Sequence, residues 1–484
     1  MQTFKRQLIA IILSLPSFVI AQSSSINWTD YDFKNSAGIS VKAELGKISV
    51  PENRKVLESR QIELSFVRFK STNPNPGNPI IYLAGGPGGS GIEAARGDRF
   101  DLFMSLREVA DVIAFDQRGT GLSNHIPTCQ SRPNIDVSIP GSNELYISKM
   151  SEAAKECISF WKSQGVEIEG YNTMENASDL NDLRIALGVS KINLWGISYG
   201  SHLAFNYIKR FEDYVDQVVL TGLEGPDETI KMPSHNQRYL ERLNSAIQND
   251  KIAREVYPDL ILLMNNVHSK LEKEPVSVPI KNRSGNEVVV GISKLDVQLV
   301  TSFLLTKNPE DAVKLPLIYQ QMQNGEFQTM AQMVFMLKSY MGRIEGMPLC
   351  MDAMSGVSKS RWNSVLEEEK SATLGRTTNF PFPDIAKNLG LPFLENEFRI
   401  NPISSVRSLF FTGTLDGRTY MESSAELAKG FKNSSQVVID GAGHDLFMST
   451  PAVTELMKKF FKGENVTNQT IQIKVPAFAV PRTN

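Results

Sequence analysis

Short apolar runs recur between residue 60 and Gly222, and polar or glycine-rich stretches separate them. Residues 62–69 alternate apolar and polar side chains, which is typical of a strand with one buried face. The predicted strands are residues 62–69, 79–84, 109–115, 192–197 and 215–220. Apolar residues at helical spacing predict helices over 178–187 and 199–211. Strands that alternate with helices indicate an α/β fold, with a mostly parallel sheet covered on both faces.

The pattern becomes mainly helical after Gly222 and stays so to about residue 400, as in residues 260–271 and 327–340. Residues 276–280 and 288–292 predict one hairpin. The α/β pattern then resumes with strands at 406–411 and 436–439 and helices at 420–430 and 449–461. We therefore expect a helical unit, residues 225–400, inserted into one α/β domain that residues 22–224 and 401–484 form together.

The first 21 residues have the pattern of a secretory leader. Lys5 and Arg6 precede an apolar run from Leu8 to Ile20, and Ala21 supplies a small residue for cleavage. An uncleaved anchor is the alternative, but the run is shorter than the roughly 20 residues that a membrane-spanning helix needs. We expect residues 1–21 to be removed, and the mature protein to be secreted or periplasmic without a stable membrane anchor.

Export permits disulfide bonds, and the chain has three cysteines: Cys129, Cys157 and Cys350. A bridge between Cys129 and Cys157 would close one loop, stabilise the fold by about 3 kcal/mol and leave Cys350 unpaired. Three buried thiols are the alternative. The spacing of the cysteines predicts no zinc site.

Composition narrows the range of partners. The 484 residues include 51 Lys and Arg against 53 Asp and Glu, a net charge of −2. A protein that binds nucleic acid normally carries a clear basic excess, so we expect no nucleic-acid partner. Glycine and proline, at 33 and 24 residues, stand at the level of ordinary globular proteins.

Ser198 lies in the sequence Gly196-Ile-Ser198-Tyr-Gly200, between a predicted strand and a predicted helix. A sharp turn from strand to helix crowds its neighbours, so the flanking positions need glycine, and the turn raises the serine hydroxyl out of the sheet. The alternative is a glycine-containing turn with an inert serine. The strand-turn-helix context favours a catalytic nucleophile.

A serine nucleophile needs a base, and His444 is the histidine that best fits, in the glycine-rich turn Gly441-Ala-Gly-His444 after the last predicted strand. Asp416 follows the strand at 406–411 and precedes His444, so we expect it to orient the imidazole. The order Ser198, Asp416, His444 is that of the α/β hydrolases. Asp440 and Asp445 remain as less favoured substitutes for Asp416.

The other histidines have ordinary interpretations. His202 follows Ser198 by four residues on the same predicted helix, which favours a packing or capping role. His235 and His268 lie in the helical unit, where a single polar side chain on a helix is typically solvated.

Acyl transfer also needs two backbone N–H groups that stabilise the oxyanion. We expect one from Tyr199, next to the nucleophile, and one from Gly86 in the glycine-rich segment 85–91 after an early strand. This segment lacks the Lys-Ser/Thr ending of a phosphate-binding loop.

Five segments together resemble the α/β-hydrolase exopeptidases of the prolyl aminopeptidase and tripeptidyl aminopeptidase family. They are Gly85-Gly-Pro-Gly88, Asp116-Gln-Arg-Gly-Thr-Gly-Leu-Ser123, the Ser198 turn, the Asp416 turn and the His444 turn. Tyr199, Ala84 and the segment Leu349-Cys350-Met-Asp352 are similar to the tripeptidyl branch. The segment 116–118 looks like a charged turn that braces the oxyanion loop.

The resemblance implies an α/β-hydrolase fold in which residues 225–400 form a mainly helical cap whose carboxylates hold the free α-amino group of the substrate. Glu224, Glu345 and Asp352 are the candidates, because a buried ammonium must be paired. The alternative for each is a solvated surface carboxylate.

These residues, with the activity that the resemblance implies, predict a serine aminopeptidase that releases N-terminal residues or short peptides through an acyl-enzyme, with no metal or cofactor. Its partners would be peptides with a free N-terminus. A carboxylesterase with the same Ser-Asp-His residues is the main alternative, because that triad also cleaves esters. A non-catalytic binding protein on a hydrolase fold is a further alternative, although such a protein does not need all three positions filled.

Overall fold

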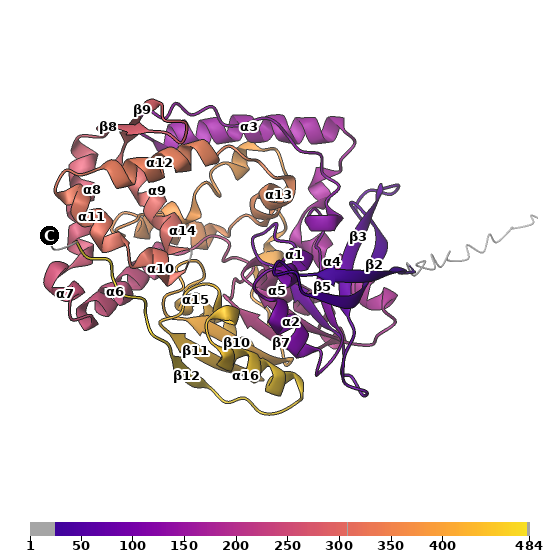
Figure 1. The fold of residues 1–484 in the computed structure, drawn as a ribbon. Coiled ribbons are helices and arrows are strands. Elements are labelled where there is room, and N and C mark those ends of the chain that lie inside the picture. The colour runs from indigo at the N-terminus through magenta and orange to yellow at the C-terminus, as the bar shows by residue number, and fades with distance from the viewer. Residues whose placement is uncertain (1–24, 307, 482–484) are drawn as a thin grey trace, which may run out of the picture.

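A ten-stranded sheet forms the centre of the computed structural model, which describes residues 25–306 and 308–481 (Figure 1). The predicted leader, residues 1–21, lies outside the described residues. The strands, in their order across the sheet, are β1 (Asn27–Lys34), β2 (Ser40–Pro51), β3 (Gln61–Phe69), β5 (Val112–Phe115), β4 (Ile80–Leu83), β6 (Ile192–Ile197), β7 (Val215–Thr221), β10 (Arg407–Gly413), β11 (Ser434–Asp440) and β12 (Gln469–Gln472). Pairing is antiparallel from β1 to β5 and parallel from β5 to β12. The predicted α/β fold is confirmed.

Helices cover both faces of this sheet. For this reason β4, β5 and β6 are buried at every position. One face packs against α4 (Thr173–Ala186), α5 (Tyr199–Phe211) and α13 (Gly346–Ser355). The other face packs against α1 (Gly91–Arg96), α2 (Phe100–Leu106) and α16 (Pro451–Phe461). The short helix α15 (Met421–Ala428) connects β10 to β11.

The chain between β7 and β10 is mainly helical and builds a hydrophobic cluster of its own. Figure 1 shows most of these helices as one mass beside the sheet. They are α6 (Pro233–Asn249), α7 (Ala253–Val256), α8 (Leu260–Lys273), α9 (Lys294–Leu305), α10 (Pro309–Ala312), α11 (Leu315–Gln323), α12 (Gln328–Tyr340), α13 and α14 (Lys359–Glu368), with the hairpin β8 (Val276–Lys281) and β9 (Glu287–Ile292). None of the helices among the described residues is both long and apolar enough to cross a membrane.

The long helix α3 (Asn143–Ser163) joins the sheet to this helical mass, along the top of Figure 1. Near its start the Tyr146 hydroxyl donates to Asp296 on α9, and near its end Trp161 packs in the cluster that covers the sheet. Cys157 of α3 is bonded to Cys129, with 5.5 Å between the Cα atoms, while Cys350 is buried and free. The predicted domain bounds place α3 within residues 22–224, although its start contacts the helical unit.

Several elements differ from their predicted bounds. α4 begins at Thr173 rather than Ser178, because the Asn172 side chain accepts from the backbone N–H groups of Met174 and Glu175 and caps the helix. β5 begins at Val112, three residues later than predicted. The antiparallel strands β1 and β2 were not predicted, because their burial pattern mixes exposed and buried positions without clear alternation.

Candidate active site

Ser198 lies at the end of β6 and is the single non-glycine residue with positive φ among the described residues, at φ 56° and ψ −125°. The turn brings backbones into contact on both sides. A Cβ at Gly200 would lie 2.0 Å from the Leu83 carbonyl oxygen, and one at Gly196 would lie 2.9 Å from the Gly200 carbonyl oxygen. Only glycine fits at these two positions, which is the physical reason for the Gly-x-Ser-x-Gly pattern.

His444 and Asp416 lie together on the loops that follow β11 and β10. The His444 Nδ1 lies 3.0 Å from Oδ2 and 3.1 Å from Oδ1 of the buried Asp416. The Asp416 carboxylate also accepts from the Thr419 hydroxyl at 2.6 Å and from the backbone N–H groups of Arg418 and Thr419. Burial raises the pKa of Asp416, but His444 and these hydrogen bonds outweigh burial and hold the pKa below its usual value. The aspartate is therefore ionised and fixed in place.

The two alternative aspartates have other partners. Asp440 accepts from the Thr414 hydroxyl at 2.8 Å. Asp445 forms an ion pair with Arg99 at 2.7 Å. The contacts of the His444 ring thus favour Asp416.

Gly222, directly after β7, lies between the first turn of α5, which follows Ser198, and the His444 ring. A Cβ at Gly222 would lie 3.0 Å from Cε1 of His444 and 2.9 Å from the Thr419 hydroxyl oxygen. On its other side, the Gly222 carbonyl accepts from Ser201, one turn of α5 from Ser198. No hydrogen bond joins the Ser198 hydroxyl to His444 in the described structure, and such a contact is often long before a substrate binds.

The glycine-rich loop after β4 packs on the serine. A Cβ at Gly85 would lie 3.0 Å from the Ser198 Cβ, and Gly86 has a φ of 128° that only glycine adopts readily. Neither Gly86 nor Tyr199 uses its backbone N–H as a donor within the described residues, so both remain free for a ligand oxygen.

The segment 116–118 holds this loop. Asp116 accepts from the Ser90 hydroxyl and from the Ile92 N–H, and Gln117 donates to the Ala84 carbonyl at 2.9 Å. The buried Arg118 binds both carboxylate oxygens of Asp179 on α4, each at 2.6 Å. The loop is thereby fixed to two neighbouring elements.

α13 covers the loop and the Tyr199 side chain. Pro348 lies against Gly88, where an added Cβ would approach its Cγ to 2.7 Å, and the Met351 sulfur lies 3.0 Å from the Tyr199 hydroxyl. Asp352, on the same helix, lines a cavity of about 260 Å³ with Met150, Pro348, Phe382 and other apolar residues. Burial and the Glu224 charge raise the pKa of Asp352 to about 7. Its carboxylate has no hydrogen-bond or ion-pair partner within the described residues.

The other two predicted carboxylates have different environments. Glu224 is buried near the end of β7, and its carboxylate pairs with the Lys231 ammonium at 2.5 Å. Burial raises the pKa of Glu224, but Lys231, His202 and Arg418 outweigh burial and lower it below the usual value. Glu345 is 50% exposed and pairs with Arg343 at 2.9 Å, at the edge of the cavity that Asp352 lines. The structure therefore brings Glu224 and Asp352 close to the serine turn and leaves Glu345 at the surface.

Histidines in the helical unit are less exposed than predicted. His268 is buried and its Nε2 lies 2.9 Å from the Tyr319 hydroxyl, so the prediction of a solvated side chain was wrong for His268. The reason is that its helix, α8, packs against α9 and α11. His202 is buried, and its Nδ1 donates to the Gly225 carbonyl.

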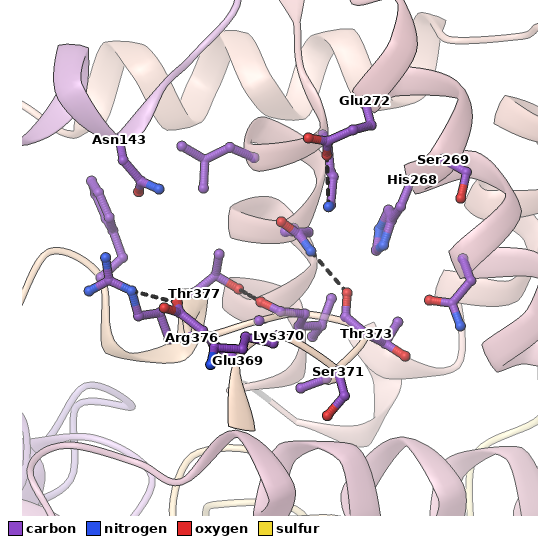
Figure 2. A pocket seen from close by; sticks show the side chains of 18 of the residues that line it. Asn143, His268, Ser269, Glu272, Glu369, Lys370, Ser371, Thr373, Arg376 and Thr377 are labelled. Carbon is purple, nitrogen blue, oxygen red and sulfur yellow. Dashed lines mark hydrogen bonds and ion pairs between the residues drawn. The ribbon is translucent and has the colours of Figure 1, made fainter. Parts of the chain in front are cut away.

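A second cavity, of about 810 Å³, lies within the helical unit between α8, α9 and residues 369–377 (Figure 2). Its charged side chains are mostly paired, as in Glu272 with Lys294 and Glu369 with Arg376. None of Ser198, Asp416 or His444 lines this cavity.

Three residues of the site were not identified from the sequence. The Thr419 hydroxyl donates to Asp416 and lies 3.2 Å from Nδ1 of His444. Lys231 neutralises Glu224, and Arg418 follows Asp416 in the same turn. The turn at Asp416 itself follows a known pattern, because an aspartate side chain often accepts from the backbone N–H two residues on. Nothing in the sequence near Lys231 indicates its partner.

Comparisons with known proteins agree with this geometry. A family model described as alpha/beta hydrolase fold matches residues 78–281, and one described as TAP-like protein matches residues 395–470. The chain has the α/β-hydrolase fold, as predicted. Several of the curated proteins to which it is similar are named as peptidases.

Serine protease Hip1 of Mycobacterium tuberculosis is 29% identical over 212 residues, which cover 42% of this chain and 40% of that protein. Tripeptidyl aminopeptidase of Streptomyces lividans is 28% identical over 192 residues, 38% of this chain and 36% of that protein. A probable proline iminopeptidase of Streptomyces coelicolor is 28% identical over 151 residues, 31% of this chain and 34% of that protein. The matched part thus spans less than half the length of these relatives.

Among solved structures, a serine hydrolase from Cycloclasticus zankles is similar at 14% identity with a TM-score of 0.38, covering 87% of this chain and 98% of that chain. The structure of Rv0554 from Mycobacterium tuberculosis is similar at 15% identity with the same TM-score, covering 87% of this chain and 100% of that chain.

Proposed function

We propose that this protein is a serine aminopeptidase that releases N-terminal residues or short peptides from substrates with a free N-terminus. The observation that carries the proposal is the pairing of His444 with the buried, ionised Asp416 beside a serine on a strained turn. The named peptidases among its relatives support peptide substrates.

The reaction follows from the positions of these groups. His444 takes the proton of Ser198 as its oxygen bonds to the scissile carbonyl carbon, and Asp416 stabilises the resulting imidazolium. The backbone N–H groups of Gly86 and Tyr199 donate to the oxyanion. The C–N bond then breaks, His444 protonates the leaving amine, and a water molecule hydrolyses the acyl-enzyme by the same steps.

Asp352 is the carboxylate that the contacts favour as the binding site for the substrate's amine. Glu224 already has the Lys231 ammonium as its partner, and Glu345 pairs with Arg343 at the surface. Asp352 faces a small cavity and has no such partner in the described structure. A buried ammonium needs one counter-charge, and an internal peptide bond supplies no ammonium, so this carboxylate would select free N-termini.

We further propose that residues 22–224 and 401–484 form the catalytic domain and that residues 225–400 form its cap. The contact of Pro348 with the oxyanion loop supports a cap position for α13. The leader pattern of residues 1–21 and the bond between Cys129 and Cys157 support export, to the periplasm or outside the cell.

Labelling with a fluorophosphonate probe, together with kinetics of the S198A variant, tests the proposal. The wild-type protein should react at Ser198, and S198A should lose labelling and at least about 10⁴-fold in kcat/KM. Ser163→Ala, an exposed serine on α3, serves as the control and should keep both. Equal labelling of S198A and wild type would contradict the assignment of the nucleophile.

Three substrate types separate the alternatives. Peptide anilides with a free amine should be cleaved much faster than the same peptides with a blocked amine. Hydrolysis of simple acyl esters with no activity on any peptide would indicate a carboxylesterase. Absence of labelling and of hydrolysis would indicate a binding protein on a hydrolase fold.

A further inference from the structure

The site contains two cations that the proposed mechanism does not use. Lys231 is buried, and its ammonium is committed to the Glu224 carboxylate and to the Glu228 carbonyl. Arg418 is part-buried in the turn between Asp416 and Thr419. Its backbone N–H donates to Asp416 at 2.8 Å, but its guanidinium forms no hydrogen bond and no ion pair with any described residue.

Every other part-buried arginine among the described residues forms at least one side-chain hydrogen bond or ion pair. Arg54, Arg242 and Arg376 bind carboxylates, whereas Arg361 and Arg407 bind backbone carbonyls. A guanidinium is always charged and presents five N–H donors in a plane that matches a carboxylate. Leaving one without a partner beside a reaction centre is therefore unusual for this chain.

The backbone of Arg418 cannot move far from the reaction centre. Asp416 accepts from the N–H of Arg418 and the N–H of Thr419, and the Thr419 hydroxyl oxygen lies 3.2 Å from Nδ1 of His444. Gly417, which directly precedes Arg418, lies against Leu305 at the end of α9. A Cβ added at Gly417 would be 2.3 Å from the Leu305 carbonyl oxygen. The turn is thus held between the sheet domain and the helical unit.

The charge of Arg418 acts on the groups that line the other side of the site. It lowers the pKa of Glu224, of Lys231 and of Asp352, so the guanidinium is close enough to influence all three. Glu224 is already neutralised by Lys231, and Asp416 faces His444. The positive charge of Arg418 is the one left without a fixed counter-ion in this cluster.

We propose that Arg418 binds a carboxylate of the substrate close to the scissile bond. The proposal rests on the proposed peptidase function and names a preference within it. The carboxylate has two possible sources: an acidic side chain on the residue that forms the acyl-enzyme, or the C-terminus of a short peptide whose last residue leaves as the amine. In either case a planar, two-bond pairing with the guanidinium would form as the substrate enters.

Two pairs of substrates distinguish these sources. The first pair is the free-amine anilides Ala-Ala-Glu and Ala-Ala-Gln, which differ only by a side-chain carboxylate. The second pair is a tetrapeptide with a C-terminal carboxylate and the same peptide with a C-terminal amide. Each pair is assayed for kcat/KM with the wild-type protein, with R418Q, and with Arg254→Gln, an exposed arginine on α7 that serves as the control.

The wild-type protein should prefer the carboxylate member of one pair by about tenfold or more, the range of a hydrogen bond to a charged group. R418Q should reduce that ratio to near one, and Arg254→Gln should keep it. Preference in the first pair assigns the side chain, and preference in the second assigns the C-terminus. No preference in either pair, or an equal loss for both members in R418Q, would overturn the inference. Failure to cleave all four peptides would instead overturn the proposed function, and this inference with it.

Discussion

Ser198 holds a backbone conformation that is unfavourable for a residue with a side chain, at a cost of about 1–3 kcal/mol. Its neighbours offset this cost, because Gly85, Gly196 and Gly200 allow three backbones to pack closely around the turn. The strained turn lies at the carboxyl end of β6, next to the loop that carries Gly86. The unfavourable backbone conformation of Ser198 thus determines the position of its hydroxyl oxygen.

Asp352 makes the proposed recognition of the amine dependent on pH. Burial and Glu224 raise its pKa from 3.8 to about 7, so below about pH 7 the carboxyl is mostly protonated and cannot pair with an ammonium. A peptide amine has a pKa of about 7.7–8.0 and loses its charge above that range. We predict that the ratio of kcat/KM for a free-amine peptide to that for a blocked peptide or ester rises as pH approaches 7 and falls above about 8. Steady-state kinetics from pH 5 to 9 measures it.

The ratio isolates Asp352, because protonation of His444, the proposed base, affects both substrates alike. D352N should lower the ratio at pH 7.5 by about tenfold or more and remove its rise toward pH 7. A ratio that keeps the same pH profile in D352N would show that another group binds the amine.

Local sequence patterns located the candidate catalytic residues, but not the other polar residues around them. Ser198, Asp416 and His444 each lie in a short turn after a strand, and such turns have local glycine signatures. Thr419, Lys231 and Arg418 have no such signature. Their roles depend on which side chains the folded chain places opposite them.

At the level of elements, the contact between α5 and β4 controls the serine turn. A Cβ at Gly200 would lie 2.0 Å from the backbone carbonyl oxygen of Leu83, and backbone cannot move aside as a flexible side chain can. We predict that G200A lowers the free energy of unfolding by more than about 2 kcal/mol, since overpacking typically costs 1–3 kcal/mol or more. Urea unfolding followed by circular dichroism measures the change.

Gly77 provides the matched control, because an added Cβ there would meet only the Val109 carbonyl oxygen, at 3.8 Å. G77A should stay within about 0.5 kcal/mol of the wild type. Equal stability of G200A and G77A would show that the turn tolerates a side chain at Gly200.

Periodicity located most central elements and missed others. β6, α5 and β7 match their predicted ranges within one residue, because buried parallel strands and amphipathic helices have strong patterns. α3 was not predicted although it has Ser142 as its cap and apolar side chains at helical spacing. β1 and β2 lie on the edge of the sheet, where partial exposure weakens the pattern.

At the level of the whole molecule, several connections hold the helical unit to the sheet domain besides the covalent links at its ends. One is α3. Another is the segment after β12, in which the Ala479 N–H donates to the Val313 carbonyl at 3.1 Å and its carbonyl accepts from the Tyr257 hydroxyl at 2.9 Å. Phe478, 8% exposed, packs in the cluster of the helical unit.

We predict that F478A loosens this connection and lowers the free energy of unfolding by about 3–5 kcal/mol, the typical cost of removing a buried phenyl ring. Hydrogen exchange should increase first in α7 and α10, which lie beside Ala479. Phe393→Ala, at a phenylalanine that is 49% exposed, should change stability by less than 1 kcal/mol. Unchanged exchange in α7 and α10 would show that the segment contributes no stability to the helical unit.

The sequence by itself determined the α/β fold, the turn around Ser198, the glycine-rich loop of Gly86 and the order of Ser198, Asp416 and His444 along the chain. These features depend on short-range physics: glycine where backbones crowd, and apolar periodicity where a face is buried. The tertiary structure alone decided that Lys231 neutralises Glu224, that Asp352 faces a cavity without a partner, that Glu345 lies at the surface, and that the Arg418 guanidinium stays unpaired. Such pairings join side chains far apart in the sequence, and only the packing of the helical unit against the sheet domain brings them within reach of one another.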